Sequence, residues 1–266
     1  MAFGHSLRLI VIAAALAGAG ACASGNPRSA PPGTPRPDQY LFDKGMDALK
    51  QRKWLLAREF LKQVDENYIQ SPLRPDAKLG IGDTYLGEGS TQALVLGINE
   101  FEEFLSYYPT NARADYAQYQ LAFCHFRQMR NPERDQTETR DTIKELDIFV
   151  GRYPGSSLLP EAKAKLREAH DRLSESDLRV GIFYFRIHWY PGAVDRLTNL
   201  LKQDPQFTTR DHAYFFLGES LVKMKRTAEA LPLYEKLVAE FERSEHLDDA
   251  KKRIAELKAQ AQAKES

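Results

Sequence analysis

A degenerate repeat is the feature that most constrains the fold of this chain. Five times, a small residue on an apolar segment is followed by a second apolar segment that carries residues of fixed type. The apolar residues recur at three- and four-residue spacing, which predicts amphipathic helices. In three copies the second segment places an alanine twelve positions after the small residue. The small residues are Gly45, Gly82, Ala122, Gly181 and Gly218.

The repeated pattern is typical of tetratricopeptide (TPR) units, which are helix pairs of about 34 residues. In the copy over residues 178–205, Gly181 is followed by Tyr184, Ala193, Leu197, Leu200 and Pro205. One pair cannot bury its apolar face alone, so successive pairs stack. We therefore predict an all-α fold, a superhelix (α-solenoid) of about five TPR-like helix pairs. An unrelated helical bundle is the alternative.

Two copies depart from the ideal spacing. The turns of the second and third copies are longer, and the third runs through residues 131–137. Between Pro154 and Gly181 the spacing exceeds the TPR norm, and residues 160–173 contain no glycine and no inner proline. This stretch predicts one long helix from about Leu159 to Arg186 that joins units three and four.

The N-terminus has the form of a targeting segment. Arg8 precedes an apolar run over residues 9–17, and small residues then lead to Cys22. Such a run is too short to span a bilayer and is typical of a cleaved secretory signal. Small residues before a cysteine resemble a bacterial lipobox, so Cys22 is the predicted lipidation site, although an ordinary signal peptide would also fit. Ala23 at the next position suggests the outer membrane.

These patterns divide the chain into four parts. Residues 1–21 are the predicted lipoprotein signal peptide. Residues 22–37 comprise the lipidated cysteine and a flexible, proline-rich tether, because small and polar residues cannot build a core. Residues 38–258 are the predicted TPR-like solenoid, and residues 259–266 are a C-terminal tail.

Composition and motifs argue against nucleic-acid binding and catalysis. The 37 basic and 37 acidic residues give a formal net charge of zero, whereas a nucleic-acid partner usually requires a basic excess. The six histidines are scattered, and Cys124 has no paired cysteine. We predict no enzyme, no metal site and no cofactor apart from the covalent lipid on Cys22. Cys124 is expected to be a core thiol, and Glu100, Glu102 and Glu103 a solvated face.

A TPR superhelix presents side chains of its first helices in a concave groove. Counting from each small residue predicts an apolar and aromatic lining suited to extended peptides. Packing of these residues against neighbouring helices is the alternative. The groove candidates are Phe42, Met46, Leu79, Tyr116, Tyr119, Phe123, Phe126 and Arg127, together with Leu49, Asp83 and Leu86.

Several ordered motifs resemble the BamD (ComL) family of outer-membrane lipoproteins over about residues 38–245. They are Arg134-Asp135-Gln136-Thr137, Arg152-Tyr153-Pro154-x-Ser156, the run from Arg172-Leu173 to Phe183-Tyr184, Ala193-Val194-x-Arg196, and Asp204-Pro205. The resemblance implies a non-enzymatic scaffold of the β-barrel assembly machinery on the periplasmic face of the outer membrane. Its N-terminal units would receive segments of unfolded outer-membrane proteins.

The same resemblance implies that the C-terminal half docks a POTRA domain of the central barrel subunit, BamA. The family often has a basic residue and a glycine in the turn of unit four. Here Arg186, Trp189 and Tyr190 lie in or beside that turn and are the docking candidates. Two other classes stay open: a periplasmic TPR adaptor for cell-envelope division or peptidoglycan proteins, and a lipoprotein of an export complex.

Overall fold

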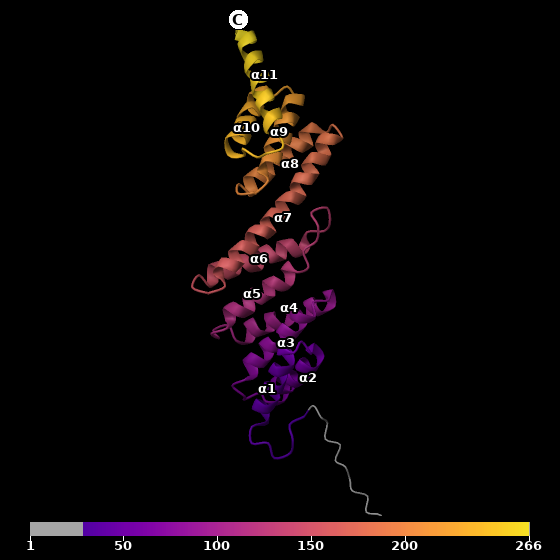
Figure 1. Cartoon of the computed structure of the whole chain (residues 1–266), viewed down its shortest axis with the longest axis vertical. Coiled ribbons are helices and arrows are strands. Elements are labelled where there is room, and N and C mark those ends of the chain that lie inside the picture. The colour runs from indigo at the N-terminus through magenta and orange to yellow at the C-terminus, as the bar shows by residue number, and fades with distance from the viewer. Residues whose placement is uncertain (1–28, 266) are drawn as a thin grey trace, which may run out of the picture.

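The computed structural model describes residues 29–265, and the predicted signal and Cys22 lie outside that range. Every regular element within it is a helix, and no strand forms there, which confirms the all-α prediction. Figure 1 shows the helices stacked along one long axis. They are α1 (Pro37–Lys50), α2 (Trp54–Asn67), α3 (Arg74–Glu88), α4 (Thr91–Tyr107), α5 (Ala114–Phe126), α6 (Thr137–Arg152), α7 (Leu159–Arg186), α8 (Tyr190–Gln203), α9 (Arg210–Lys223), α10 (Thr227–Glu240) and α11 (Leu247–Glu265).

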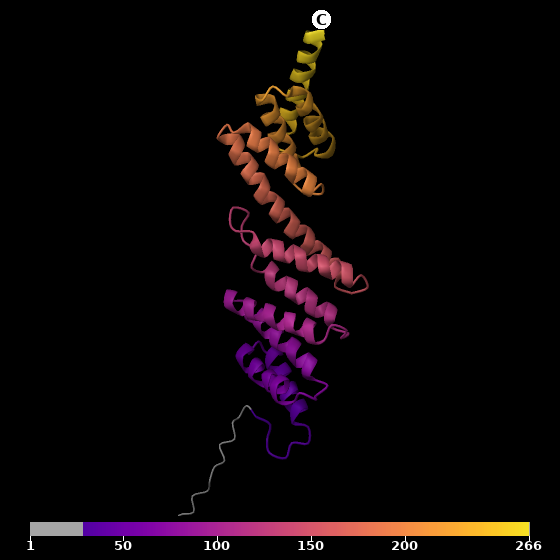
Figure 2. The same cartoon turned by 180° about the vertical axis from the view of Figure 1, so that it is seen from behind.

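The long helix α7 divides the stack into two parts. The pairs α1/α2, α3/α4 and α5/α6 lie on its N-terminal side, and α8 to α11 lie on the other side (Figures 1 and 2). It packs against α6 in the N-terminal part and against α8 and α9 in the C-terminal part. The predicted helix from about Leu159 to Arg186 is confirmed, with 28 residues.

Both ends of the described chain differ from a simple tether and tail. In residues 30–36 the Thr34 hydroxyl donates to the Pro31 carbonyl oxygen (2.6 Å) and closes a turn. Ala30 packs against the buried cluster formed mainly by α1, α2 and α3, which we call the first core cluster. Helix α11 continues to Glu265, so the segment expected to be a tail is helical over residues 259–265. It projects beyond the stack in both views (Figures 1 and 2).

The repeated small residues are the points at which two helices of a pair touch. A Cβ atom on Gly45 would lie 2.6 Å from Leu61 Cγ, and one on Gly181 would lie 2.5 Å from Leu197 Cδ2. Gly82 meets Phe101, and Gly218 meets Tyr234, each at 2.7 Å. Because those partners are fully buried, a larger residue in the first helix would force the pair apart.

An aspartate clasp fastens the loop that enters each of several units. In the loop, a serine or threonine hydroxyl donates to an aspartate on the first helix of the unit before it. The Ser156 hydroxyl, for example, lies 2.6 Å from Asp115 Oδ2 and also accepts from the backbone N–H of Leu158. The serine therefore bonds the loop both to the preceding unit and to the start of the next helix. The pairs are Ser71 with Asp38, Ser156 with Asp115, Thr208 with Asp171, and Ser244 with Asp211.

Candidate protein-binding surfaces

Two of the predicted groove residues belong to the core. Leu79 is fully buried in the cluster shared by α3, α4 and α5, and Tyr119 is 5% exposed against Phe149. The prediction that these two side chains line an open groove is therefore wrong. Leu86 is buried as well. The first helices of units two and three are covered by the units on both sides, so fewer of their faces remain open.

A row of aromatic rings on α5 is partly covered by α7. Phe123 stacks between Tyr119 and Phe126, with ring centroids 6.1 and 5.9 Å apart. The Lys165 ammonium of α7 lies 4.7 Å from the Phe123 ring and 4.5 Å from the Phe126 ring. Phe123 and Phe126 keep part of their surface open. The open faces of these aromatic rings can attract a cation by cation–π interaction or contact an apolar side chain.

The remaining groove candidates are half-buried or tied to neighbouring helices. Phe42 and Met46 pack at the edge of the first core cluster, and Leu49 is half-buried. Arg127 is exposed as a residue, but its guanidinium donates to the Leu86 carbonyl oxygen at 2.6 Å. Tyr116 donates its hydroxyl to Asp83 Oδ1 at 2.8 Å. This face of the N-terminal units is therefore a shallow, firmly held surface.

Asp83 gives this surface a pH dependence. Burial, the largest influence, raises the pKa of its carboxyl to about 6, against the smaller opposing effects of the Tyr116 hydroxyl and Arg113. Because folding raises this pKa, Asp83 stabilises the fold most below its pKa in the unfolded chain. That contribution to the free energy of unfolding is lost as the pH rises through about 6. Between pH 4 and 6.5 we expect Asp83→Asn to gain about 2 kcal/mol relative to the native chain. Urea unfolding across that range measures the difference, and parallel curves would contradict it.

Several exposed apolar side chains lie at the junction of α7 and α8. Three side chains within seven residues, Phe183, Ile187 and Trp189, are 56%, 52% and 52% exposed. Trp189 is held in place because its ring packs edge-on to Tyr184, 4.6 Å between centroids, and lies over Gly192. Arg186 is exposed and forms no ion pair within residues 29–265, and Tyr190 is half-buried. We call Phe183, Arg186, Ile187 and Trp189 the α7–α8 patch.

The motifs behind the family resemblance have structural roles. Gln136 is 4% exposed and donates to the carbonyl oxygens of Asn131 and Arg134, both at 2.9 Å, so it shapes the long loop of unit three. Arg172 of α7 donates to the Arg130 carbonyl in the same loop at 2.9 Å. Arg172 therefore ties α7 to the long loop of unit three.

Other side chains that could carry chemistry are used in packing. Cys124 is fully buried, and burial raises the pKa of its thiol to about 12. Glu100 and Glu103, expected on a solvated face, both bind Lys78, whose side chain is 7% exposed. All three side chains belong to unit two, where Glu100 is only 17% exposed, which corrects the expectation for that residue, while Glu102 and Glu103 are exposed as expected. Among the helices of residues 29–265, none is long and apolar enough to cross a membrane.

Comparison of the sequence with known protein families identifies the family of this chain. The profile of the YfiO family, described as outer membrane lipoprotein, matches residues 35–224, and a tetratricopeptide repeat profile matches residues 212–244. The chain belongs to the YfiO family of outer-membrane lipoproteins. The family match includes α1 to α9 and the α7–α8 patch, and it confirms the resemblance to BamD.

Curated relatives of this YfiO-family chain carry the name outer membrane protein assembly factor BamD. The protein from Caulobacter vibrioides is 26% identical over 73% of this chain and 63% of its own length, and the one from Vibrio cholerae is 26% identical over 64% and 73%. Among solved structures, the TPR2AB-domain:pHSP90 complex of yeast Sti1 is 14% identical, with 84% of each chain covered and a TM-score of 0.44.

Proposed function

We propose that this chain is a non-enzymatic scaffold subunit of the outer-membrane β-barrel assembly machinery. The family match and the name shared by its relatives support that role. A lipid on Cys22 would hold it at the periplasmic face of the outer membrane. The stack of helix pairs supplies large surfaces for other polypeptides, which suits a scaffold.

The α7–α8 patch is the proposed docking site for a POTRA domain of a BamA-like barrel subunit. The observation that carries this proposal is the gathering of Phe183, Ile187 and Trp189, which are three of the nine exposed large apolar side chains in residues 29–265. Exposed apolar clusters of this kind mark interaction sites. Arg186 adds a charge beside the apolar centre, an arrangement common in protein interfaces.

The double variant Phe183→Ser/Ile187→Ser tests the docking site. Both side chains are more than half exposed, so the fold is expected to keep its stability while the partner is lost. We expect at least about tenfold less barrel subunit to co-purify after mild detergent extraction. The matched control is Tyr107→Ser/Ile148→Ser, which removes exposed apolar groups (64% and 39%) from other units. Equal recovery with both variants would contradict the proposal, and recovery of division or export proteins instead would favour the alternatives.

The N-terminal units are the proposed receiving surface for segments of unfolded outer-membrane proteins. Phe42, Met46, Phe123 and Phe126 offer apolar surface that is already held in place by neighbouring helices. A hollow of about 380 Å³ between α2, α3 and α4 adds Leu55 and Leu96, which are 63% and 39% exposed. An extended chain with alternating apolar residues could use both surfaces.

The lipid anchor is tested by Cys22→Ala. Several acyl chains bind a bilayer far more strongly than one, so the native chain is expected in the membrane pellet and the variant in the soluble periplasmic fraction. Cys124→Ala serves as the control, since that thiol is buried. A Cys22→Ala protein that stays with the outer membrane in cells without the barrel machinery would contradict the anchor.

A further inference from the structure

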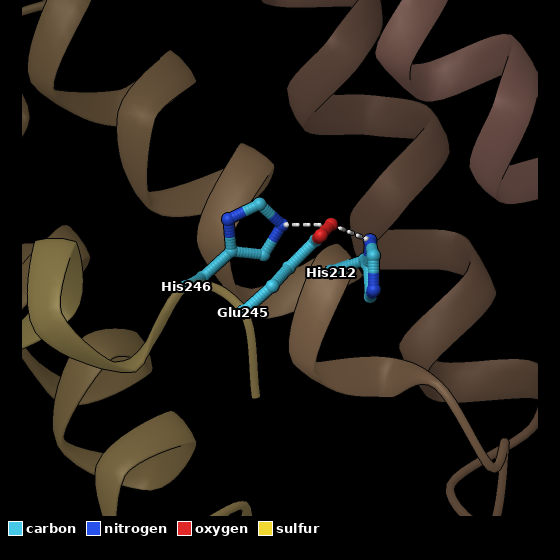
Figure 3. Close-up of side chains that lie close together, drawn as sticks. All are labelled: His212, Glu245 and His246. Carbon is cyan, nitrogen blue, oxygen red and sulfur yellow. Dashed lines mark ion pairs between the residues drawn. The ribbon is translucent and has the colours of Figure 1, made fainter. Parts of the chain in front are cut away.

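Two histidines and a glutamate from separate parts of the chain meet near the C-terminal end of the stack. His212 lies in the first turn of α9, and Glu245 and His246 lie in the turn before α11. Figure 3 shows the Glu245 carboxylate between the two imidazole rings. Its Oε1 lies 3.7 Å from His212 Nδ1 and 3.6 Å from His246 Nε2. All three ligand atoms lie within 4.8 Å of one another.

The inner ring of this cluster has an unused nitrogen. The His246 side chain is 13% exposed, and its Nε2 is buried without a hydrogen-bond partner within the described residues. Phe215 holds the ring, with centroids 4.1 Å apart and planes parallel to within 1°. A buried polar atom normally has a hydrogen-bond partner or another ligand. The Nε2 atom of His246 faces Glu245, so a bound ion between them would supply that partner.

A second cluster, His125 with Glu138 and Asp141, provides a comparison. There His125 Nδ1 already forms a direct hydrogen bond of 2.8 Å with Glu138 Oε2, and the site contains one imidazole. Its histidine is therefore already paired with a carboxylate. The His212 cluster contains two imidazoles, and its carboxylate lies beyond hydrogen-bond distance from both, so space remains at its centre.

The surroundings of the His212 cluster hold its two backbone segments together and supply a further carboxylate. The Ser244 hydroxyl donates to Asp211 at 2.6 Å, which fixes the turn beside α9. Asp211 Oδ2 lies 4.0 Å from His212 Nε2, on the side where metal-bound histidines usually meet a carboxylate.

We propose that His212, Glu245 and His246 form a binding site for a divalent transition metal, with Zn²⁺ as the best fit. Two histidines and one carboxylate form a common three-ligand zinc set, with a fourth position left to water or another ligand. Ligand atoms on tetrahedral zinc are roughly 3.3 Å apart, so small side-chain movements would close the site. Glu245 is 69% exposed and leaves the fourth position open. A bound ion would tie α9 to the turn before α11.

Zinc titration of the full chain tests this site. The protein is purified without a histidine tag, stripped with EDTA, and titrated with ZnCl₂ against a chromophoric chelator. We expect about one Zn²⁺ per chain, and at least about tenfold weaker binding in His212→Ala and in Glu245→Gln. Cobalt substitution should give the visible absorption of a tetrahedral site in the native chain only.

The matched control is His125→Ala, which removes a histidine from the comparison cluster and should leave zinc binding unchanged. A His246→Ala variant would also lose packing against Phe215, so its far-UV circular dichroism is recorded as well. The more exposed His212 supplies an independent test. Unchanged affinity in the double variant His212→Ala/Glu245→Gln would overturn the proposal. So would the absence of stoichiometric binding at 100 µM ZnCl₂, a concentration that nearly saturates a site with a dissociation constant of about 1 µM.

Discussion

Replacing Gly181 with alanine is expected to lower the free energy of unfolding by about 2 kcal/mol. The new Cβ would lie 2.5 Å from Leu197 Cδ2 and 2.6 Å from its Cγ, and Leu197 is fully buried between α7 and α8. The pair can accept the methyl group only if α8 moves away. Urea unfolding, followed by circular dichroism at 222 nm, measures the loss.

A second glycine separates this effect from helix propensity. Gly151 also lies in a helix, near the end of α6, and nothing lies within 4 Å of a Cβ placed there. Gly151→Ala should therefore be neutral or raise stability by about 0.5 kcal/mol. If Gly181→Ala also stabilises the chain, the close approach of α7 and α8 is not what holds unit four together.

Arg167→Met is expected to destabilise the chain by about 2 kcal/mol. Arg167 of α7 forms two hydrogen bonds to the Asp204 carboxylate, one of them 2.9 Å long, and Ser174 adds a third at 2.7 Å. Asp204 is 7% exposed, so loss of the guanidinium leaves a buried charge with one partner. Because Arg167 is 31% exposed, water reduces the loss below that of a fully buried pair.

A second arginine–aspartate pair provides the control for this clamp. Arg196 of α8 pairs with Asp177 of α7 at 2.5 Å, but its side chain is 44% exposed. Arg196→Met should cost less than about 0.5 kcal/mol. Burial opposes ionisation of Asp204, but its hydrogen bonds with Arg167 and Ser174 outweigh burial and lower its pKa. The ionised Asp204 should thus add to the free energy of unfolding above about pH 4, and this contribution should fade at lower pH. Equal losses from both arginine variants would contradict the clamp.

Much of the fold can be predicted from sequence because the repeat encodes contact between neighbouring helices. Gly45, Gly181 and Gly218 lie at a constant spacing from Leu61, Leu197 and Tyr234, so a periodic pattern reports a tertiary contact. The bounds of α7 also follow locally, since residues 160–173 contain nothing that ends a helix.

The binding surfaces are harder to predict because stacking covers helices from two sides. In α3 six consecutive residues, 77–82, are buried, so no face of that turn is open and Leu79 cannot line a groove. Counting along a helix identifies a face but not what covers it. The cluster of His212, Glu245 and His246 cannot be found from the spacing of neighbouring residues either, because more than thirty residues separate its two parts. The aspartate clasps join equally distant segments.

Site-specific photocross-linking in cells tests the docking claim most directly. A photoreactive residue is placed at Ile187, in the α7–α8 patch, and in a matched chain at Tyr107, which is also exposed. We expect one major cross-linked partner from position 187, a barrel subunit with POTRA domains identified by mass spectrometry, and none from position 107. A cross-link from position 107 to that subunit with none from position 187 would contradict it.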